Sequence, residues 1–387
     1  MTTQPAADRG RIVIVSGIRV RNDAISNIIC QQRRVLVDAG YRVDVIVQHR
    51  DSDPGAWETT SPHAWDLLRN PIYLAADLVI FHFGIFYDLF NALTLAHPRA
   101  RRVVHFHNVT PPELLSGATR GFAQRGLVQL VTAEFADAVW SDSPHNTDVL
   151  CARTAIDPEL VVPMAPSVPE VGGRQASIGT TTASTAPVRL ISVGRFVPAK
   201  GLTELVAAIA LLDPELRRDL RLTLAGSISN SDAEYFRTLN RQIADAGLTD
   251  LIDVASDPPD DELAALLWHS DILVSASHHE GFCVPVIEAL ATHCRVIVTD
   301  AGALPDTAGP CGVVVPAHDA AALSVAIADE IRAVKAVRAG DATAEAAERD
   351  RLDQAARHLE QFSPEQFRDR TLRAVEHELR LGAARSA

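Results

Sequence analysis

Lysine is nearly absent from this chain of 387 residues, in which Lys200 and Lys335 are two of 36 basic side chains. Arginine is therefore the usual cation, so a lysine within a glycine-bounded loop needs a specific explanation. Basic charge as a whole is also deficient, because 49 acidic residues give a formal net charge of −13. Nucleic-acid-binding proteins carry a basic surface field, so we expect no nucleic acid among the partners.

Cysteine is scarce, and long apolar runs are missing. The cysteines number five, an odd count, and none forms a C-x-x-C pair, which argues against a disulfide framework and favours a reducing compartment. No apolar run approaches the roughly 18 residues that span a bilayer, and residues 1–9 lack the pattern of a signal peptide. We therefore expect a cytoplasmic protein.

Short apolar runs alternate with amphipathic segments in both halves, which predicts parallel sheets covered by helices. A length of 387 residues fits two domains, each large enough for its own core. In the first half the expected strands are 11–16, 43–48, 78–83, 102–106, 138–141 and 160–164. In the second half they are 189–193, 220–225, 251–254, 272–275, 295–299 and 312–315.

Residues 167–187 differ from both halves, because Pro, Gly, Ser and Thr dominate them and no periodicity is visible. This composition predicts a flexible linker. It would separate an N-terminal domain, 1–166, from a C-terminal domain, 188–362. Two doubly wound domains of this kind bind ligands at the carboxyl ends of their strands.

Glu280 and Glu288 bracket the sequence Gly-Phe-Cys-Val-Pro-Val-Ile. An apolar strand precedes Glu280, and Pro285 is expected to begin a helix over 286–292. Unpaired N–H groups at such a helix start form an anion site, and phosphate is the usual anion. Carboxylates at the same place can accept hydrogen bonds from hydroxyl groups, so the segment favours a nucleotide-sugar. The alternative is an ordinary turn with two solvated glutamates.

A second loop carries cations to a helix start. Gly194 and Arg195 follow an apolar strand, while Lys200 and Gly201 precede a helix expected over 202–212. A lysine ammonium suits a point contact to phosphate, and an arginine can bind a diphosphate in bidentate fashion. The alternative is a pair of surface cations, but cations at this end oppose the helix dipole unless an anion lies between them.

The two loops resemble those of the family 4 retaining glycosyltransferases of GT-B fold, which carry G-R-x4-K-G followed by E-G-F-x-x-P-x-x-E. Both motifs are intact here. The resemblance extends to the segments 22–27, 106–112 and 300–306. It implies an α/β fold of two doubly wound Rossmann-like domains facing across a cleft, with the acceptor on the N-terminal side and the donor on the C-terminal side. It also implies that a last helix, 363–387, returns to the N-terminal domain.

The resemblance further implies roles for individual residues. Arg195 and Lys200 would hold the donor diphosphate, with Glu280 near the transferred sugar and Glu288 near the ribose. Catalysis would involve Glu280, Arg195, Lys200 and His107, without a metal or other cofactor. The remaining donor-binding candidates are Gly17, Gly194, Gly281, Phe282, Cys283 and Val284, and the candidates on the acceptor side are His82, His107 and Asn108.

Two features of the first half have competing interpretations. His107 follows a predicted strand and would face the cleft, or it could cap loop backbone. A metal site of His82, His105 and His107 is disfavoured because no carboxylate shares their spacing. The segment 111–122 contains apolar residues near Arg120 and Arg125; it could contact a membrane, although an ordinary helix is the preferred interpretation.

The predicted function is retaining transfer of a sugar from a nucleotide-diphosphate sugar to a glycan, a lipid-linked molecule or a small molecule. One alternative is a non-catalytic GT-B module that only binds the nucleotide-sugar. Another is a sugar-nucleotide epimerase of GT-B fold, which shares the architecture but not this pair of motifs.

Overall fold

The computed structural model describes residues 9–19, 23–50, 58–168, 186–228 and 232–386, and the chain divides into two compact units. Most of the predicted linker, namely residues 169–185, lies outside the described residues. What we call the N-terminal unit comprises Met1–Glu113, Gly117–Pro166 and Glu365–Ala387, and the C-terminal unit comprises Leu114–Ser116 and Ser167–Pro364.

A parallel sheet forms the centre of the N-terminal unit. Within the described residues its strand order is β3-β2-β1-β4-β5-β6-β7, so the order reverses beside β1. All pairings are parallel, and the carboxyl ends of the strands therefore meet at one edge. The strands are β1 (Arg11–Arg19), β2 (Arg42–Arg50), β3 (Glu58–Thr60), β4 (Leu78–Phe83), β5 (Arg101–Phe106), β6 (Ala138–Ser141) and β7 (Val161–Pro163).

Helices cover this sheet, and β4 is buried along its whole length. Local sequence sets the helix starts: Asp23 caps α1 by accepting a hydrogen bond from the backbone N–H of Ser26, and Ser143 caps α5 in the same way through Asn146. The helices are α1 (Ala24–Asp38), α2 (Ala64–Leu67), α3 (Pro71–Leu74), α4 (Gly117–Gln129), α5 (Pro144–Cys151) and α14 (Pro364–Ser386).

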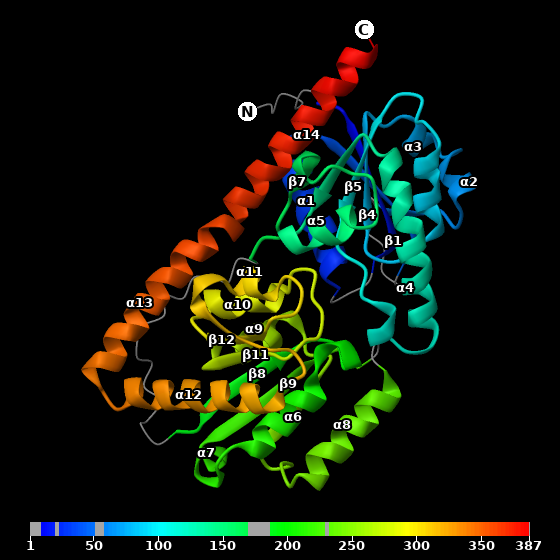
Figure 1. Cartoon of the computed structure of the whole chain (residues 1–387). Helices are drawn as coiled ribbons and strands as arrows, with labels where there is room; N and C mark the ends of the chain where they lie inside the picture. Colours follow the sequence, from blue (N-terminus) through cyan, green and yellow to red (C-terminus); the bar gives the residue numbers. More distant parts are fainter. Residues whose placement is uncertain (1–8, 20–22, 51–57, 169–185, 229–231, 387) are drawn as a thin grey trace. The chain divides into compact units, whose positions relative to one another are not determined.

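The last helix, α14, packs on the N-terminal unit although it is the final segment of the chain (Figure 1). Val375 is fully buried in the core cluster that contains Ile12. Arg101 on β5 forms a buried ion pair with Glu378, with 2.5 Å between Nε and Oε2. Apolar burial and a desolvated ion pair thus both attach α14 to this sheet.

The C-terminal unit has a second parallel sheet, with the order β10-β9-β8-β11-β12-β13 in the described part of the chain. Its strands are β8 (Val188–Val193), β9 (Leu220–Gly226), β10 (Ile252–Ser256), β11 (Ile272–Ser275), β12 (Arg295–Thr299) and β13 (Gly312–Val315). Its helices are α6 (Leu202–Leu211), α7 (Pro214–Arg218), α8 (Ala233–Asp245), α9 (Asp260–Trp268), α10 (Val284–Ala291), α11 (Leu304–Ala308), α12 (Ala320–Arg338) and α13 (Ala342–Leu359).

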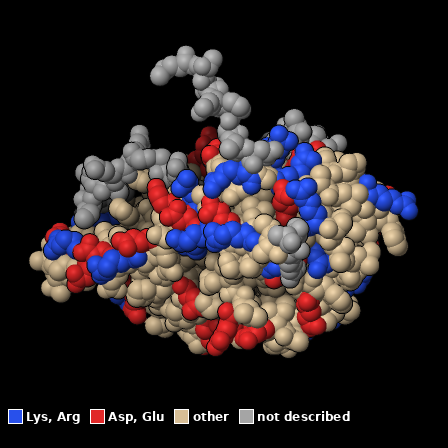
Figure 2. All heavy atoms as spheres, turned by 90° about the horizontal axis from the view of Figure 1, so that it is seen from above, with Lys and Arg blue, Asp and Glu red and all other residues tan. Residues whose placement is uncertain are grey.

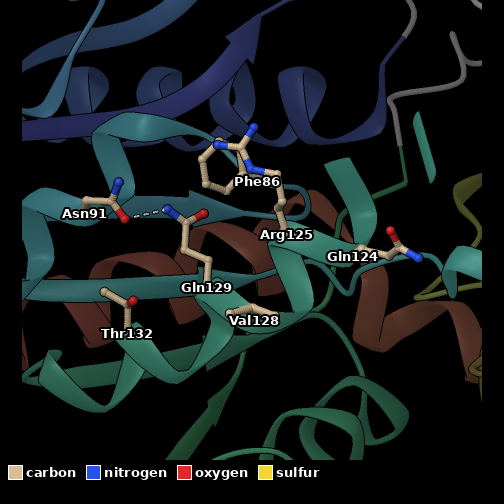
Figure 3. A pocket seen from close by; sticks show the side chains of 7 residues that line it. All are labelled: Phe86, Asn91, Gln124, Arg125, Val128, Gln129 and Thr132. Atoms are coloured by element: carbon tan, nitrogen blue, oxygen red, sulfur yellow. Dashed lines mark hydrogen bonds between the residues drawn. The ribbon is translucent and has the colours of Figure 1, made fainter. Parts of the chain in front are cut away.

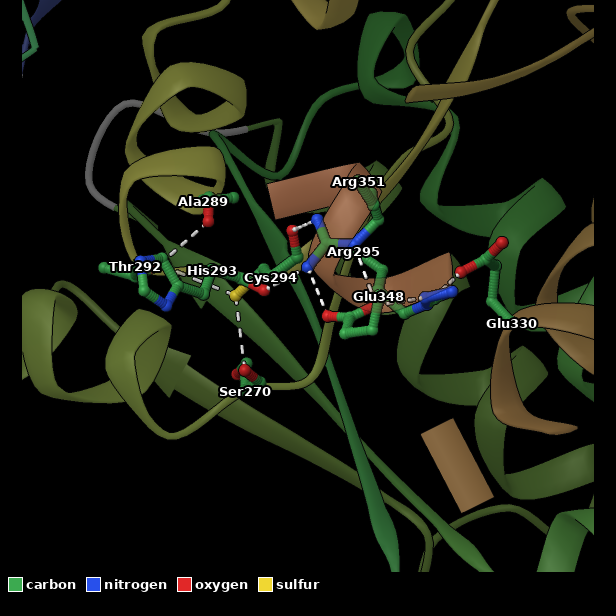
Figure 4. A network of polar contacts seen from close by, with 9 residues as sticks. All are labelled: Ser270, Ala289, Thr292, His293, Cys294, Arg295, Glu330, Glu348 and Arg351. Carbon is green, nitrogen blue, oxygen red and sulfur yellow. Dashed lines mark hydrogen bonds and ion pairs between the residues drawn. The ribbon is translucent and has the colours of Figure 1, made fainter. Parts of the chain in front are cut away.

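A polar network joins β12 to the long helices α12 and α13 (Figure 4). Arg295 binds Glu330 and Glu348 at 2.6 and 2.8 Å, and Arg351 binds Glu348 at 2.7 Å. Arg351 also donates to the backbone carbonyl of Cys294 at 3.0 Å. These side chains are mostly buried, so the network links the start of β12 to α12 and α13 through ion pairs that are largely shielded from solvent.

The predicted fold class is confirmed by the two parallel sheets with covering helices. Each predicted strand is present, although the ends differ by a few residues. The sequence analysis missed β3, whose polar sequence Glu-Thr-Thr lacks an apolar run. It also extended the strand 160–164 too far, because Leu160 ends a short 3-10 helix, Pro158–Leu160.

Surface composition is mixed. On the face seen in Figure 2, Lys and Arg lie interspersed with Asp and Glu. None of the helices in the described ranges is both long and apolar enough to cross a bilayer.

Candidate functional site

Two loops of the C-terminal unit meet at the carboxyl ends of β8 and β11, which are neighbouring strands. Lys200 Nζ lies 2.5 Å from Glu280 Oε1, so the two sequence motifs are joined by an ion pair. Ser277 Oγ donates to the same carboxylate oxygen at 2.7 Å, and the backbone N–H of His278 donates to the Ala199 carbonyl at 2.8 Å. The sequence analysis assigned Lys200 to phosphate and Glu280 to sugar, and it did not anticipate their direct contact.

Both members of this pair are charged at neutral pH. Burial alone would raise the pKa of Glu280, but the charge of Lys200 and the hydrogen bonds from Lys200 and Ser277 lower it below its usual value. Burial would lower the pKa of Lys200, but the Glu280 carboxylate outweighs burial and raises it. The site therefore holds a partly buried cation ready for an anionic ligand, with a carboxylate beside it.

Glycines allow the loops to approach each other this closely. Gly201 has φ 57°, and a Cβ there would lie 2.0 Å from the Ala276 carbonyl oxygen. Gly302 has φ 62°, and a Cβ there would lie 2.3 Å from the Glu280 carbonyl oxygen, which also accepts from the Ala303 N–H at 2.9 Å. The Glu280 carbonyl is thus held against the turn at Gly302 and Ala303.

Helix α10 begins earlier than predicted. It spans Val284–Ala291, so Pro285 is its second residue and not its first, because Cys283 at φ 78° turns the chain into the helix. The backbone N–H groups of Phe282, Cys283 and Val284 make no hydrogen bond with any described residue. Three unpaired donors at the positive end of a helix dipole can bind an anion. Thr307 Oγ1 fixes this turn by donating to the Phe282 carbonyl at 2.6 Å.

Two titrating groups, Cys283 on this turn and Glu288 on α10, have strongly shifted pKa values. Burial, followed by the nearby charge of Asp260, raises the pKa of Glu288 on α10 to about 7. Burial, followed by the charge of Glu280, raises the pKa of the Cys283 thiol to about 12, so this thiol is not a nucleophile at neutral pH. Glu288 can accordingly change its charge within the physiological pH range.

Arg195 and two glycines complete the predicted donor set. The Arg195 side chain is exposed, and its guanidinium has no hydrogen-bond or ion-pair partner among the described residues. Gly194 gives room to Lys200, whose Cε would lie 3.0 Å from a Cβ at this position. Gly17 belongs to the N-terminal unit, where a Cβ would collide with Tyr87 at 2.8 Å, so packing alone explains this glycine.

The histidines of the N-terminal unit form a buried cluster. His107 Nε2 lies 2.8 Å from His82 Nδ1, and His107 Nδ1 lies 2.7 Å from Asp142 Oδ2. His105 Nε2 binds the other oxygen of Asp142 at 2.8 Å. Both ring nitrogens of His107 are therefore occupied by hydrogen bonds within the N-terminal unit.

Asn108 also has an internal role. It adopts φ 72°, is 6% exposed, and donates from Nδ2 to Asn146 Oδ1 at 2.8 Å. Its own oxygen accepts from the Val109 N–H at 2.7 Å. These contacts fix the chain after β5 against the start of α5.

Asp142 was missed by the sequence analysis, which found no carboxylate spaced with the three histidines. Asp142 is distant from these histidines in the sequence. The available signal was its position directly after β6, a strand that pairs with β5. Two groups in the described residues have potential metal-ligand atoms within 4.8 Å of one another: His82, His105 and His107, and Glu204, His278 and His318.

A hollow of about 480 Å³ lies beside α4 in the N-terminal unit (Figure 3). Arg125 stacks over the Phe86 ring at 3.6 Å, and Gln129 donates from Nε2 to Asn91 Oδ1 at 2.8 Å. The segment 111–122, for which an ordinary helix was preferred, is helical only in part: Pro112–Leu114 form a 3-10 helix and α4 begins at Gly117, with Phe122 on it 45% exposed.

Comparisons with known proteins concern both units. Residues 176–343 match the family model described as glycosyl transferases group 1. The MMP alpha-(1->4)-mannosyltransferase of Mycolicibacterium hassiacum is 37% identical over 30% of this chain and 26% of its own length. The D-inositol 3-phosphate glycosyltransferase of Streptomyces bingchenggensis is 29% identical over 69% of this chain and 59% of its own length. The matched parts thus span from about a quarter to six tenths of these relatives.

Among solved structures, HepE of Anabaena in complex with UDP and glucose superimposes with a TM-score of 0.72 at 15% identity, covering 95% of this chain and 100% of that chain. Likeness at this identity shows the fold alone. The chain has the GT-B fold, and the matched family model and relatives support a glycosyltransferase.

Proposed function

We propose that this protein is a retaining glycosyltransferase that takes a sugar from a nucleotide-diphosphate sugar and needs neither a metal nor another cofactor. The observation that carries the proposal is a set of groups near Glu280 that can bind an anion. They are Lys200, the Arg195 guanidinium and the N–H groups at the start of α10, the last two without partners among the described residues. The family match over residues 176–343 and the UDP and glucose bound by HepE support it.

The proposed chemistry follows from charge. Departure of a nucleoside diphosphate develops negative charge, and Arg195, Lys200 and the α10 amides would stabilise it in place of a metal. The diphosphate would compete with Glu280 for Lys200, and the released Glu280 carboxylate would accept hydrogen bonds from the transferred sugar. Glu288 would accept from the ribose.

We place the acceptor on the N-terminal unit, near the carboxyl ends of β4 and β5, where His82, His107 and Asn108 lie. The acceptor would be a carbohydrate, a lipid-linked molecule or a phosphorylated polyol, the last suggested by the inositol phosphate in the name of one relative. Peripheral membrane contact through the exposed side of α4 remains part of the proposal. The five free cysteines fit the proposed cytoplasmic location.

Release of nucleoside diphosphate from UDP-, GDP-, ADP- and TDP-sugars tests this proposal, with D-inositol 3-phosphate, oligosaccharides and lipid extracts as acceptors. We expect one donor to give release that depends on an acceptor, is unaffected by EDTA, and yields a product of unchanged anomeric configuration by NMR. Binding without release for every donor would favour the non-catalytic module. Conversion of the donor sugar to its epimer would favour the epimerase.

A further inference from the structure

A continuous hydrogen-bond chain crosses the buried edge of the N-terminal sheet. Gln32 Nε2 lies 3.1 Å from His105 Nδ1, and His105 Nε2 lies 2.8 Å from Asp142 Oδ1. From the other carboxylate oxygen the chain continues to His107 Nδ1 at 2.7 Å, and from His107 Nε2 to His82 Nδ1 at 2.8 Å. None of these residues is more than 9% exposed.

When the three rings are neutral, the charge of Asp142 fixes every proton along this hydrogen-bond network. An ionised carboxylate only accepts, so His105 must donate from Nε2 and His107 from Nδ1. His105 Nδ1 then accepts from the Gln32 amide, and His107 Nε2 accepts from His82 Nδ1–H. One tautomer remains for each ring, and His82 is left with an acceptor lone pair on Nε2.

A proton, and not a metal ion, fits the space between His82 and His107. Their rings are nearly coplanar, at 15°, with centroids 5.0 Å apart, as expected for an in-plane hydrogen bond between imidazoles. Two nitrogens that share a tetrahedral zinc at bonds of 2.0–2.1 Å lie roughly 3.3 Å apart. The observed nitrogen separation of 2.8 Å is shorter.

One end of this series of hydrogen bonds, at His82, lacks a partner among the described residues. His82 Nε2 is buried and has no hydrogen bond to any residue that the structure describes, and buried acceptors without donors are rare and costly. His82 lies in register with Ser16 of β1 and His105 of β5, one residue before the end of β4. This carboxyl edge, beside the reversal of strand order, is where doubly wound sheets bind ligands.

We propose that His82 Nε2 accepts a hydrogen bond from a hydroxyl group of the acceptor substrate, and that Asp142 is a positioning residue that holds His82 in the required tautomer through His107. The proposal rests on the glycosyltransferase function proposed above. Described protein atoms cover Nε2, so the contact requires a conformation other than the one in this structure. Burial and the neighbouring histidines lower the pKa of His82, which therefore stays neutral and accepts a hydrogen bond without taking the proton.

The protonation states can be read by long-range ¹H–¹⁵N correlation spectra of protein labelled at histidine. Between pH 6 and 8 we expect His82 and His107 as Nδ1–H tautomers and His105 as the Nε2–H tautomer. A charged His82, or an Nε2–H tautomer of it, in the wild-type protein overturns the proposal. This measurement requires no activity, so it is independent of the glycosyltransferase assignment.

The role of Asp142 is tested with Asp142→Asn, because an amide that donates to His107 reverses the tautomers of His107 and His82. Asp148→Asn is the matched control, because Asp148 is an exposed residue of α5 that takes no part in this series of hydrogen bonds. With D-inositol 3-phosphate as probe, we expect the first variant alone to raise KM about tenfold with a smaller change in kcat. Unchanged His82 and His107 tautomers in Asp142→Asn, or equal KM values in the two variants, overturn the positioning role.

The ligand contact is tested separately by adding D-inositol 3-phosphate or an active acceptor from the release assay to labelled wild-type protein. We expect the ¹⁵N resonance of His82 Nε2 to move toward the hydrogen-bonded range. Saturating acceptor that leaves this resonance in place overturns the contact. Failure of every donor to release diphosphate overturns the proposed function but leaves the tautomer result standing.

Discussion

Lys200 and Glu280 are 80 residues apart in the chain, yet the lysine ammonium contacts the glutamate carboxylate at 2.5 Å. Each favours the charged form of the other, because burial lowers the pKa of Lys200 and raises that of Glu280 while their mutual attraction acts in the opposite direction. A diphosphate ligand would enter a site whose cation is already held in place and partly desolvated. This pair therefore links the two loops structurally and, in the proposed function, chemically.

Lys200→Ala should weaken binding of the donor nucleotide-sugar by about 10- to 100-fold, because a charge-assisted hydrogen bond contributes about 1.5–3 kcal/mol. Calorimetric titration would measure the dissociation constant. Lys335→Ala is the matched control: it removes the other lysine of the chain, which pairs with Asp219 and is 41% exposed. Equal affinities in the two variants would contradict a phosphate contact at Lys200.

Donor affinity should rise with pH through the pKa of Glu288. The folded-state pKa of about 7 lies above the ordinary 4.5, so the carboxyl is protonated below pH 7 and ionised above it. Only the ionised form offers two charged oxygens that accept from hydroxyl groups, and we expect about tenfold tighter binding at pH 8 than at pH 6. Intact nucleotide-sugar should be used, because free nucleoside diphosphates titrate in the same range.

Glu288→Gln is the control for this pH dependence, because glutamine keeps the shape and cannot titrate. Its donor affinity should be nearly constant from pH 6 to 8. A wild-type curve as flat as that of the variant would show that Glu288 does not bind the ribose.

The Glu288 carboxyl should also make the free energy of unfolding depend on pH. A raised folded-state pKa stabilises the fold fully below about pH 4.5, and this contribution is lost as pH rises toward 7. Glu288→Gln should therefore reduce the decline in unfolding free energy between pH 5 and 7, measured in urea. The same slope in both proteins would contradict the assigned burial of the charge.

Arg295→Met should destabilise the C-terminal unit by about 3–5 kcal/mol, because it removes the mostly buried ion-pair partner of Glu330 and leaves Glu348 with Arg351 alone. Arg332→Ala is the comparison. Its ion pair with Asp329 on α12 is more than 60% exposed and should contribute about 0–1 kcal/mol. Urea unfolding monitored on both variants would measure the difference, and similar losses would contradict a structural role for the network in Figure 4.

Much of the fold could be predicted from the sequence because each buried strand is a run of consecutive apolar residues. The run 78–83 was identified with its correct bounds, since it is apolar throughout except for His82. The three-residue β3 was missed because it is polar, and its position depends on pairing with β2. Helix α10 was misplaced because the left-handed conformation of Cys283 has no sequence signal comparable to glycine.

The site was predictable where its residues lie in contiguous motifs. Gly194, Arg195, Lys200 and Glu280 were found together with their loops, but the contact between Lys200 and Glu280 depends on which strands are neighbours. Asp142 was missed for the same reason. It reaches the histidines only because β6 pairs with β5, and a single sequence does not show that pairing.

The measurement that tests the central claim most directly is nucleoside diphosphate release by wild-type protein and Lys200→Ala with the same donor and acceptor. The account predicts acceptor-dependent release by the wild type and a rate at least about 10- to 100-fold lower in the variant. Release at the wild-type rate by Lys200→Ala would contradict it.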